Sequence, residues 1–146
     1  MRIYLDNCCL QRPLDNQTQP RIRVETEAVF AVLATIQAGD VSLCNSEARL
    51  YEVSRIPDGT RRAESLSMLT LASQHLLVTD AVEELAVSYE KQGIRAMDAV
   101  HLALASIAKV DYFCTCDDQL FRKASRLAGV DCQVITLLDL VVELSS

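Results

Sequence analysis

The sequence has no tryptophan, only four glycines and three prolines, and two histidines. Its glycines stand singly, so it contains neither a GxGxxG loop nor a Walker-type GK[ST] loop, and this argues against a bound nucleotide cofactor. Aromatic residues make up 5% of the chain. Because so few aromatic rings could stack on unpaired bases, any binding of nucleic acid would have to depend on phosphates and metal.

Long apolar runs are also missing. No stretch approaches the roughly 18 residues needed to cross a bilayer, and Asp6 interrupts the N-terminus before a signal-peptide core could form. We therefore expect a cytoplasmic protein whose six cysteines are reduced thiols. Cys8 and Cys9 are adjacent and Cys114 and Cys116 lie two apart, so no CxxC spacing is present and the sequence argues against a structural zinc site.

With 146 residues, 50% of them hydrophobic, the chain has the size of one compact domain, which we expect to span residues 1–146. The formal charge of −6 argues against a nucleic-acid partner. Most of the basic residues, however, are arginines that could grip phosphate, and they cluster. Ion pairing on solvated helix faces explains any one cluster equally well. The clusters are Arg12, Arg21 and Arg23; Arg49, Arg55, Arg61 and Arg62; and Arg122, Lys123 and Arg126.

Strand-like apolar runs alternate with stretches of helical period along the chain. We predict strands at Ile3–Leu5, Val41–Cys44, Leu76–Val78, Tyr112–Thr115 and Gln133–Ile135, and a polar loop at Asn7–Pro20. Helices are predicted at Arg21–Ala38, around Glu47 and Glu52 behind an Asn45 or Ser46 cap, at Thr60–Ser73, from a capping box at Asp80 to Gly93, at Ala96–Lys109, at Asp118–Leu127 and at the C-terminus. This order predicts an α/β fold, a three-layer α/β/α sandwich with a four- or five-stranded parallel sheet.

Acidic residues stand where such a sheet binds its ligands, beyond the carboxyl ends of the strands. Asp6 closes the first strand, Asp117 follows the Tyr112–Thr115 strand, Asp98 lies in the first turn of an apolar helix, and Glu52 lies on the helix after the second strand. Any one of them could be a simple helix cap. Together they would repel one another unless a cation neutralised them, and oxygen ligands favour Mg²⁺ or Mn²⁺ over zinc. Such ions support phosphodiester hydrolysis.

Asp98 is surrounded by apolar residues, where a carboxylate is costly unless it is paired or binds metal. The alternative is an acid that only complements the helix dipole. His101 lies one turn further on. It could be a base or a ligand, but we expect a structural histidine hydrogen-bonded beside Asp98.

Three segments carry a family resemblance: YLD at the N-terminus, MDAVHLALA in the middle and CTCDDQLF near the end resemble the aspartate motifs of PIN domains. The resemblance implies acidic, catalytic and metal-holding roles for Asp6, Glu52, Asp98 and Asp117. It also implies polar support from Thr115 and makes Asp118 a possible fifth acid.

PIN domains are commonly metal-dependent nucleases that prefer single-stranded RNA, many are toxins of toxin–antitoxin pairs, and many are dimers. The resemblance therefore implies Mg²⁺ or Mn²⁺ as cofactor, RNA as substrate, an antitoxin as partner and a homodimer. Arg55 and Arg122 are candidates for phosphate contacts. Glu47 competes with Glu52 for the second acidic place, but the interval from Ser46 to the glutamate favours Glu52.

Two other functions compete with a nuclease. A receiver-like phosphoacceptor domain would share the acidic sheet edge, but it would want an acidic pair near the first strand and a late lysine. Asp6 stands alone, and Lys109 precedes its strand. The stronger alternative is a PIN-like module that binds RNA or protein with little turnover, which the negative charge favours.

Overall fold

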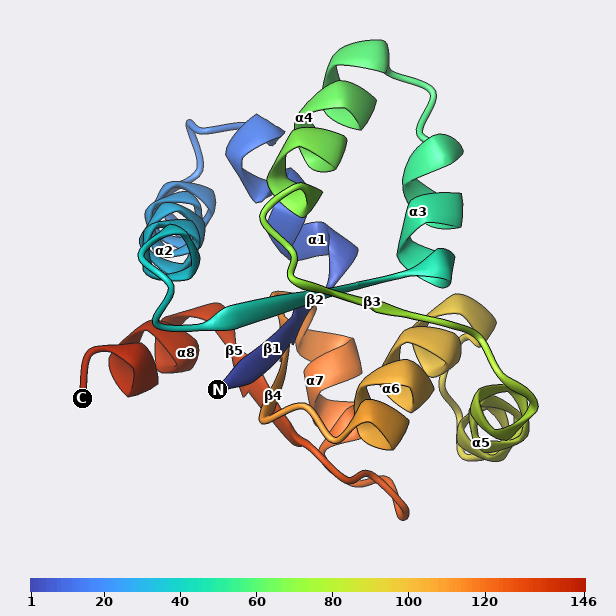
Figure 1. Ribbon diagram of the computed structural model, residues 1–146. Helices are drawn as coiled ribbons and strands as arrows, with labels where there is room; N and C mark the ends of the chain where they lie inside the picture. The colour runs from blue at the N-terminus through green and yellow to red at the C-terminus, as the bar shows by residue number, and fades with distance from the viewer.

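The computed structural model describes residues 1–146 and is built on one sheet of five parallel strands in the order β3-β2-β1-β4-β5 (Figure 1). In chain order the strands are β1 (Arg2–Leu5), β2 (Ser42–Ser46), β3 (Gln74–Leu76), β4 (Tyr112–Thr115) and β5 (Gln133–Thr136). The predicted three-layer α/β/α fold is confirmed, with five strands.

The central strands bury both faces. Ile3 and Leu5 of β1 belong to one hydrophobic cluster, whereas Tyr4 between them belongs to a second cluster on the opposite face. In the neighbouring β4, Cys114 joins the first cluster and Phe113 the second. Side chains alternate across a strand, so short and continuously apolar strands of this kind fit only a sheet covered on both sides.

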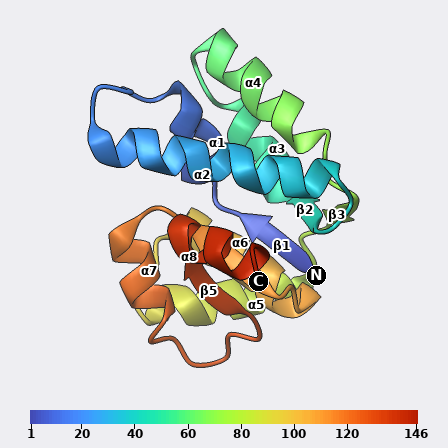
Figure 2. The same cartoon turned by 90° about the vertical axis from the view of Figure 1, so that its left-hand side faces the viewer.

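Helices supply both covers (Figures 1 and 2). The first cluster takes residues from α1, α2, α4 and α8, the second from α5, α6 and α7, and α8 packs against α2. The helices are α1 (Asn7–Gln11), the 3-10 helix η1 (Arg12–Leu14), α2 (Pro20–Gln37), α3 (Glu47–Ser54), α4 (Gly59–Leu69), α5 (Asp80–Lys91), α6 (Ala96–Ala108), α7 (Asp118–Ala124) and α8 (Leu137–Leu144). None of them combines the length and the apolar character that crossing a bilayer requires.

The predicted polar loop at Asn7–Pro20 is wrong in its first half. Asp6 caps α1 by accepting the Asn7 N–H at 2.8 Å, and α1 then turns into η1, which has Pro13 in its first turn. Polar composition concealed the apolar side of this segment, where Cys9 and Leu10 are fully buried. The segment therefore packs into the first hydrophobic cluster instead of running over the surface.

Several element boundaries also differ from the prediction. The third strand lies two residues earlier, at Gln74–Leu76, and the next helix is capped by Thr79, whose hydroxyl accepts the Val82 N–H at 3.3 Å. The capping box at Asp80 is therefore wrong, because Asp80 is already the first helical residue. The helices predicted to reach Ser73 and Leu127 end at Leu69 and Ala124.

Candidate active site

The order in which the chain adds strands to the sheet changes sides at β1. From β1 it proceeds outward through β2 to β3, and it then returns to add β4 on the other side of β1. Beyond the carboxyl ends of such a strand pair lies the crevice in which open α/β sheets bind their ligands. Asp6 follows β1 directly and Asp117 follows β4 by two residues, so both flank this crevice.

Asp6 is 7% exposed. One carboxylate oxygen caps α1, and the other, Oδ2, accepts hydrogen bonds from the Thr115 hydroxyl at 2.8 Å and from the Cys8 thiol at 3.4 Å. Burial, together with the neighbouring Cys8 thiol, raises the pKa of Asp6 from 3.8 to about 7, against the opposing effects of Arg49 and Thr115. A carboxylate held this way gains from a cation that would stabilise its charged form.

Asp117 caps the N-terminus of α7 and lines the crevice. Its Oδ1 accepts the N–H groups of Gln119 at 2.9 Å and Leu120 at 3.1 Å, which is the ordinary N-cap arrangement. One of its carboxylate oxygens is thereby committed to the helix. Its other oxygen, Oδ2, has no protein donor among the hydrogen bonds of the structure.

Asp98 is the third residue of α6, as predicted, and it is half-buried. Burial and the charges of Asp6, Asp117 and Glu52 raise its pKa from 3.8 to about 6. The other three acids predicted from the sequence therefore lie close enough for their charges to act on Asp98. Asp98 and Asp117 also line the same small cleft of about 20 Å³, together with Gly93, Ile94, Arg95, Gln119, Leu120 and Lys123.

Glu52 approaches the site from α3. Its Oε1 lies 3.3 Å from Arg49 Nε and 3.2 Å from His101 Nε2. Burial alone would raise the pKa of Glu52, but the contact with His101 and the charge of Arg49 outweigh it and lower that pKa. Glu52 is therefore an anion at neutral pH. Arg49 itself is 2% exposed and donates from Nη1 to the Leu5 carbonyl oxygen, so it supports the site from within the core.

A row of buried polar side chains, linked by hydrogen bonds, leads to Glu52. The Tyr4 hydroxyl lies 2.7 Å from Ser46 Oγ and 2.5 Å from His101 Nδ1. With Tyr4 donating to Nδ1, a neutral imidazole carries its hydrogen on Nε2, facing Glu52. Burial lowers the pKa of His101 and raises that of Tyr4 to about 12, so both side chains are neutral at pH 7. His101 is a buried structural histidine as predicted, but its acidic partner is Glu52, not Asp98.

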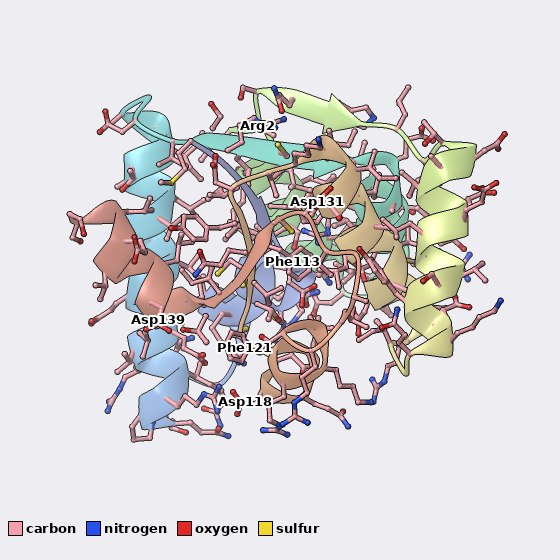
Figure 3. The ribbon with its side chains drawn as sticks, turned by 90° about the horizontal axis from the view of Figure 1, so that it is seen from below. Arg2, Phe113, Asp118, Phe121, Asp131 and Asp139 are labelled. Atoms are coloured by element: carbon pink, nitrogen blue, oxygen red, sulfur yellow. The ribbon has the colours of Figure 1, made fainter.

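Other predicted residues lie elsewhere. Asp118 forms a bidentate ion pair with Arg21, at 2.7 and 2.8 Å, on the side of α7 that faces α2 (Figure 3). Glu47 is the first residue of α3, and its Oε1 accepts the Val78 N–H at 3.2 Å. Arg55 and Arg122 are exposed, and neither lines the cleft between Asp98 and Asp117.

The sequence analysis did not identify two of the residues that line the cleft as site residues. Arg95 precedes α6 as its cap residue, and Lys123 reaches across from α7 to donate to the Gly93 carbonyl oxygen at 3.3 Å. Both line the cleft beside Asp98 and Asp117. Arg95 could have been identified as a site residue from the sequence, because it lies three residues before Asp98. Nothing in the sequence singled out Lys123 from its basic neighbours.

The acidic residues fit a hard divalent cation. Carboxylates supply oxygen ligands only. Besides burial, the charges of Asp6, Asp117 and Glu52 raise the pKa of Asp98, and a cation would relieve that repulsion. Their oxygens do not form a closed cage: the only His, Cys, Asp or Glu ligand atoms that lie three together within 4.8 Å are the sulfurs of Cys8, Cys9 and Cys116. An open arrangement suits Mg²⁺, which keeps several waters and binds through one or two carboxylates.

Comparison with known proteins supports the fold. No protein-family model matches the chain, and no curated protein resembles it in sequence. Among solved structures it is similar to a chain of VapBC2 from Rickettsia felis, which was crystallised bound to a DNA fragment from the promoter of the pair. The match has a TM-score of 0.60 and 14% identity, and covers 93% of this chain and 98% of that chain. At this identity the likeness establishes a shared PIN-like fold.

Proposed function

We propose that this protein is a metal-dependent endoribonuclease that hydrolyses phosphodiester bonds of single-stranded RNA, with Asp6, Glu52, Asp98 and Asp117 holding Mg²⁺ or Mn²⁺. The observation that carries the proposal is geometric: Asp6 and Asp117 lie beyond the carboxyl ends of the adjacent strands β1 and β4, and Asp98 lines one cleft with Asp117. The charges of Asp6, Asp117 and Glu52 also act on Asp98. The PIN-like motifs and the PIN-like fold support the same reaction.

Each residue has a defined task in this proposal. Asp6 is oriented by Thr115, and Glu52 is kept anionic by Arg49 and His101. Arg95 and Lys123 flank Asp98 and Asp117, where they can bind the phosphates on either side of the scissile bond. A bound divalent cation would supply an activated water and stabilisation of the leaving oxygen.

The biological setting is part of the proposal. PIN domains are commonly toxins of toxin–antitoxin pairs, and the similar fold of a VapBC2 chain favours that role here. We therefore propose a cytoplasmic toxin of one PIN-like domain that forms a homodimer and is held by an antitoxin protein. Asp118 and Thr115 would act as supporting residues, and Arg55 and Arg122 would contact RNA outside the cleft.

The decisive experiment is cleavage of single-stranded RNA with added Mn²⁺, with and without EDTA. Asp98→Asn preserves shape and removes one charge, so we expect it to keep the fold and to abolish cleavage. Asp139→Asn is the matched control, because Asp139 is also the third residue of its helix but is exposed and does not line the cleft of Asp98 and Asp117. RNA binding without any cleavage would favour the binding module suggested by the charge of −6. Cleavage that persists in EDTA would refute the metal-dependent reaction.

A further inference from the structure

Three cysteines converge beside Asp6, and one of them, Cys8, donates a hydrogen bond to it. Cys8 and Cys9 lie in α1, and Cys116 follows β4, more than a hundred residues later in the chain. Their three sulfurs lie within 4.8 Å of one another. In a tetrahedral zinc site with Zn–S bonds of about 2.3 Å, the sulfurs are about 3.8 Å apart, so small side-chain rotations would close this set around an ion.

We propose that Cys8, Cys9 and Cys116 form a binding site for a thiophilic cation of the Zn²⁺ and Cd²⁺ class. Thiolates select such soft or borderline ions over Mg²⁺ and Mn²⁺, so this site and the acidic site bind different metals. Cys8 is half-buried and gives an entry path, while Cys9 and Cys116 are buried.

The surroundings of the sulfurs fit metal ligation. The Cys116 N–H donates to Cys8 Sγ at 3.3 Å, and an N–H donor of this kind can orient a thiolate ligand. Cys9 Sγ donates to the Cys114 carbonyl oxygen at 3.5 Å. On metal binding the thiols would release their protons to solvent, and Cys9 would exchange this hydrogen bond for a bond to the metal. Three protein ligands leave a fourth position for water or for the Asp6 carboxylate, whose Oδ2 lies 3.4 Å from Cys8 Sγ.

Occupation of this site would inhibit hydrolysis, a consequence that rests on the proposed nuclease function, whereas the site itself does not. Cys8 Sγ contacts both Asp6 Oδ2 and Thr115 Oγ1, at 3.4 and 3.5 Å. A cation that draws Cys8 away, or recruits Asp6 as its fourth ligand, removes Asp6 from the acidic site. Zinc would then inhibit hydrolysis, whereas manganese would support it.

The binding test uses the full chain in a phosphine reductant, titrated with Cd²⁺ and followed by thiolate-to-metal charge-transfer absorption. We expect saturation at one cation per chain, and a loss of affinity of about tenfold or more in Cys116→Ser. Cys132→Ser is the control, because Cys132 is also half-buried but lies outside the cluster. Absorption that never saturates, or an equal loss in Cys132→Ser, would show that the three thiols only pack as small apolar side chains.

Alkylation of the unmodified protein covers the case in which Cys116→Ser fails to fold. Zn²⁺ or Cd²⁺ should slow modification of Cys8 and leave Cys132 unchanged, whereas Mg²⁺ should protect neither. Equal modification of Cys8 with and without Zn²⁺ would overturn the site. In the activity arm, one equivalent of Zn²⁺ should inhibit Mn²⁺-dependent cleavage, and uninhibited cleavage would refute the regulatory effect. A protein that binds Cd²⁺ but cleaves no RNA would refute the nuclease and leave the thiol site standing.

Discussion

The Thr115 hydroxyl joins two of the four acids: it donates to Asp6 Oδ2 at 2.8 Å and accepts the Asp117 N–H at 3.1 Å. Thr115 is the last residue of β4 and is 1% exposed. Because β1 and β4 are adjacent strands, this one side chain fixes Asp6 beyond the first and the backbone of Asp117 beyond the second. The geometry of the crevice therefore depends on a residue that is itself uncharged.

Thr115→Val should lower Mn²⁺-dependent cleavage by about tenfold or more, because a hydrogen bond to a charged group contributes roughly 1.5–3 kcal/mol. The loss of the donor should also raise the pKa of Asp6 further, since Thr115 opposes the upward shift. The acid limb of the pH–rate profile should then move to higher pH. Thr115→Ser restores the hydroxyl and should restore both rate and profile. A serine variant as slow as the valine variant would show that Thr115 acts through packing alone.

The choice between Glu47 and Glu52 gives a second prediction. Glu52 contacts His101 and Arg49 and acts on Asp98, whereas Glu47 accepts a backbone N–H from Val78 at the edge of the sheet. Glu52→Gln should lower Mn²⁺-dependent cleavage by about an order of magnitude or more. Glu47→Gln keeps an acceptor oxygen and should cost only about 0.5 kcal/mol of stability at the helix terminus. An inactive Glu47→Gln beside an active Glu52→Gln would reverse the assignment.

Whether a feature of this site could be predicted from the sequence depends on how far apart in the sequence the contacting residues lie. The positions of Asp6, Asp98 and Asp117 follow from local signals, because each stands at a strand end or in the first turn of a helix, and parallel strands bring those positions to one edge. No strand order was predicted from the sequence; the PIN-like motifs implied only that these acids share one site. Local patterns and the family resemblance were enough to predict the fold, whereas the shared role of the four acids stays a prediction.

Contacts between distant residues were beyond reach of the sequence. His101 is paired with Tyr4 and Glu52, which lie 97 and 49 positions away, and a helical pattern says nothing about either partner. A search for CxxC spacing could not find the three thiols, because Cys8 and Cys9 follow β1 whereas Cys116 follows β4. Helix α1 was missed for a different reason: five residues with two polar ends carry no measurable period, and only the Asp6 cap marks the start.

The raised pKa values of Asp6 and Asp98 predict an unusual pH dependence of stability. An acid whose pKa rises from 3.8 to about 7 on folding keeps its proton in the folded state over a range where the unfolded chain has lost it. The free energy of unfolding of the metal-free protein should therefore fall as pH rises from about 4 to 7. Asp98, with a pKa of about 6, adds to the lower part of this range.

Thermal unfolding in EDTA at several pH values measures this effect. Asp6→Asn cannot ionise, so its midpoint should exceed that of the unmodified protein at pH 8 and approach it at pH 4. Mn²⁺ should raise the midpoint of the unmodified protein far more at pH 8 than at pH 4, because the cation replaces the proton. Asp139→Asn should follow the unmodified protein throughout. A midpoint that rises with pH in EDTA would contradict the raised pKa of Asp6.

The last prediction concerns how an acidic protein holds a polyanion. The chain carries a formal charge of −6, so phosphate contacts must come from a few well-placed cations and not from the overall charge. Arg95 and Lys123 line the cleft with Asp98 and Asp117, while Arg55 and Arg122 are exposed outside it, and the guanidinium of Arg55 lies 5.8 Å from the Tyr51 ring centre.

Replacing any one of these four residues by Gln removes the same single charge, so differences between the variants report position and not net charge. We expect Arg95→Gln and Lys123→Gln to weaken binding of single-stranded RNA more than Arg55→Gln or Arg122→Gln. Each cleft contact should also account for about 0.7 of the slope of log affinity against log salt. The measurements belong in the cleavage-deficient Asp98→Asn background, where RNA stays intact. Equal losses and equal slopes in all four variants would mean that RNA senses only the overall charge, and that the cleft beside Asp98 is not where its phosphates bind.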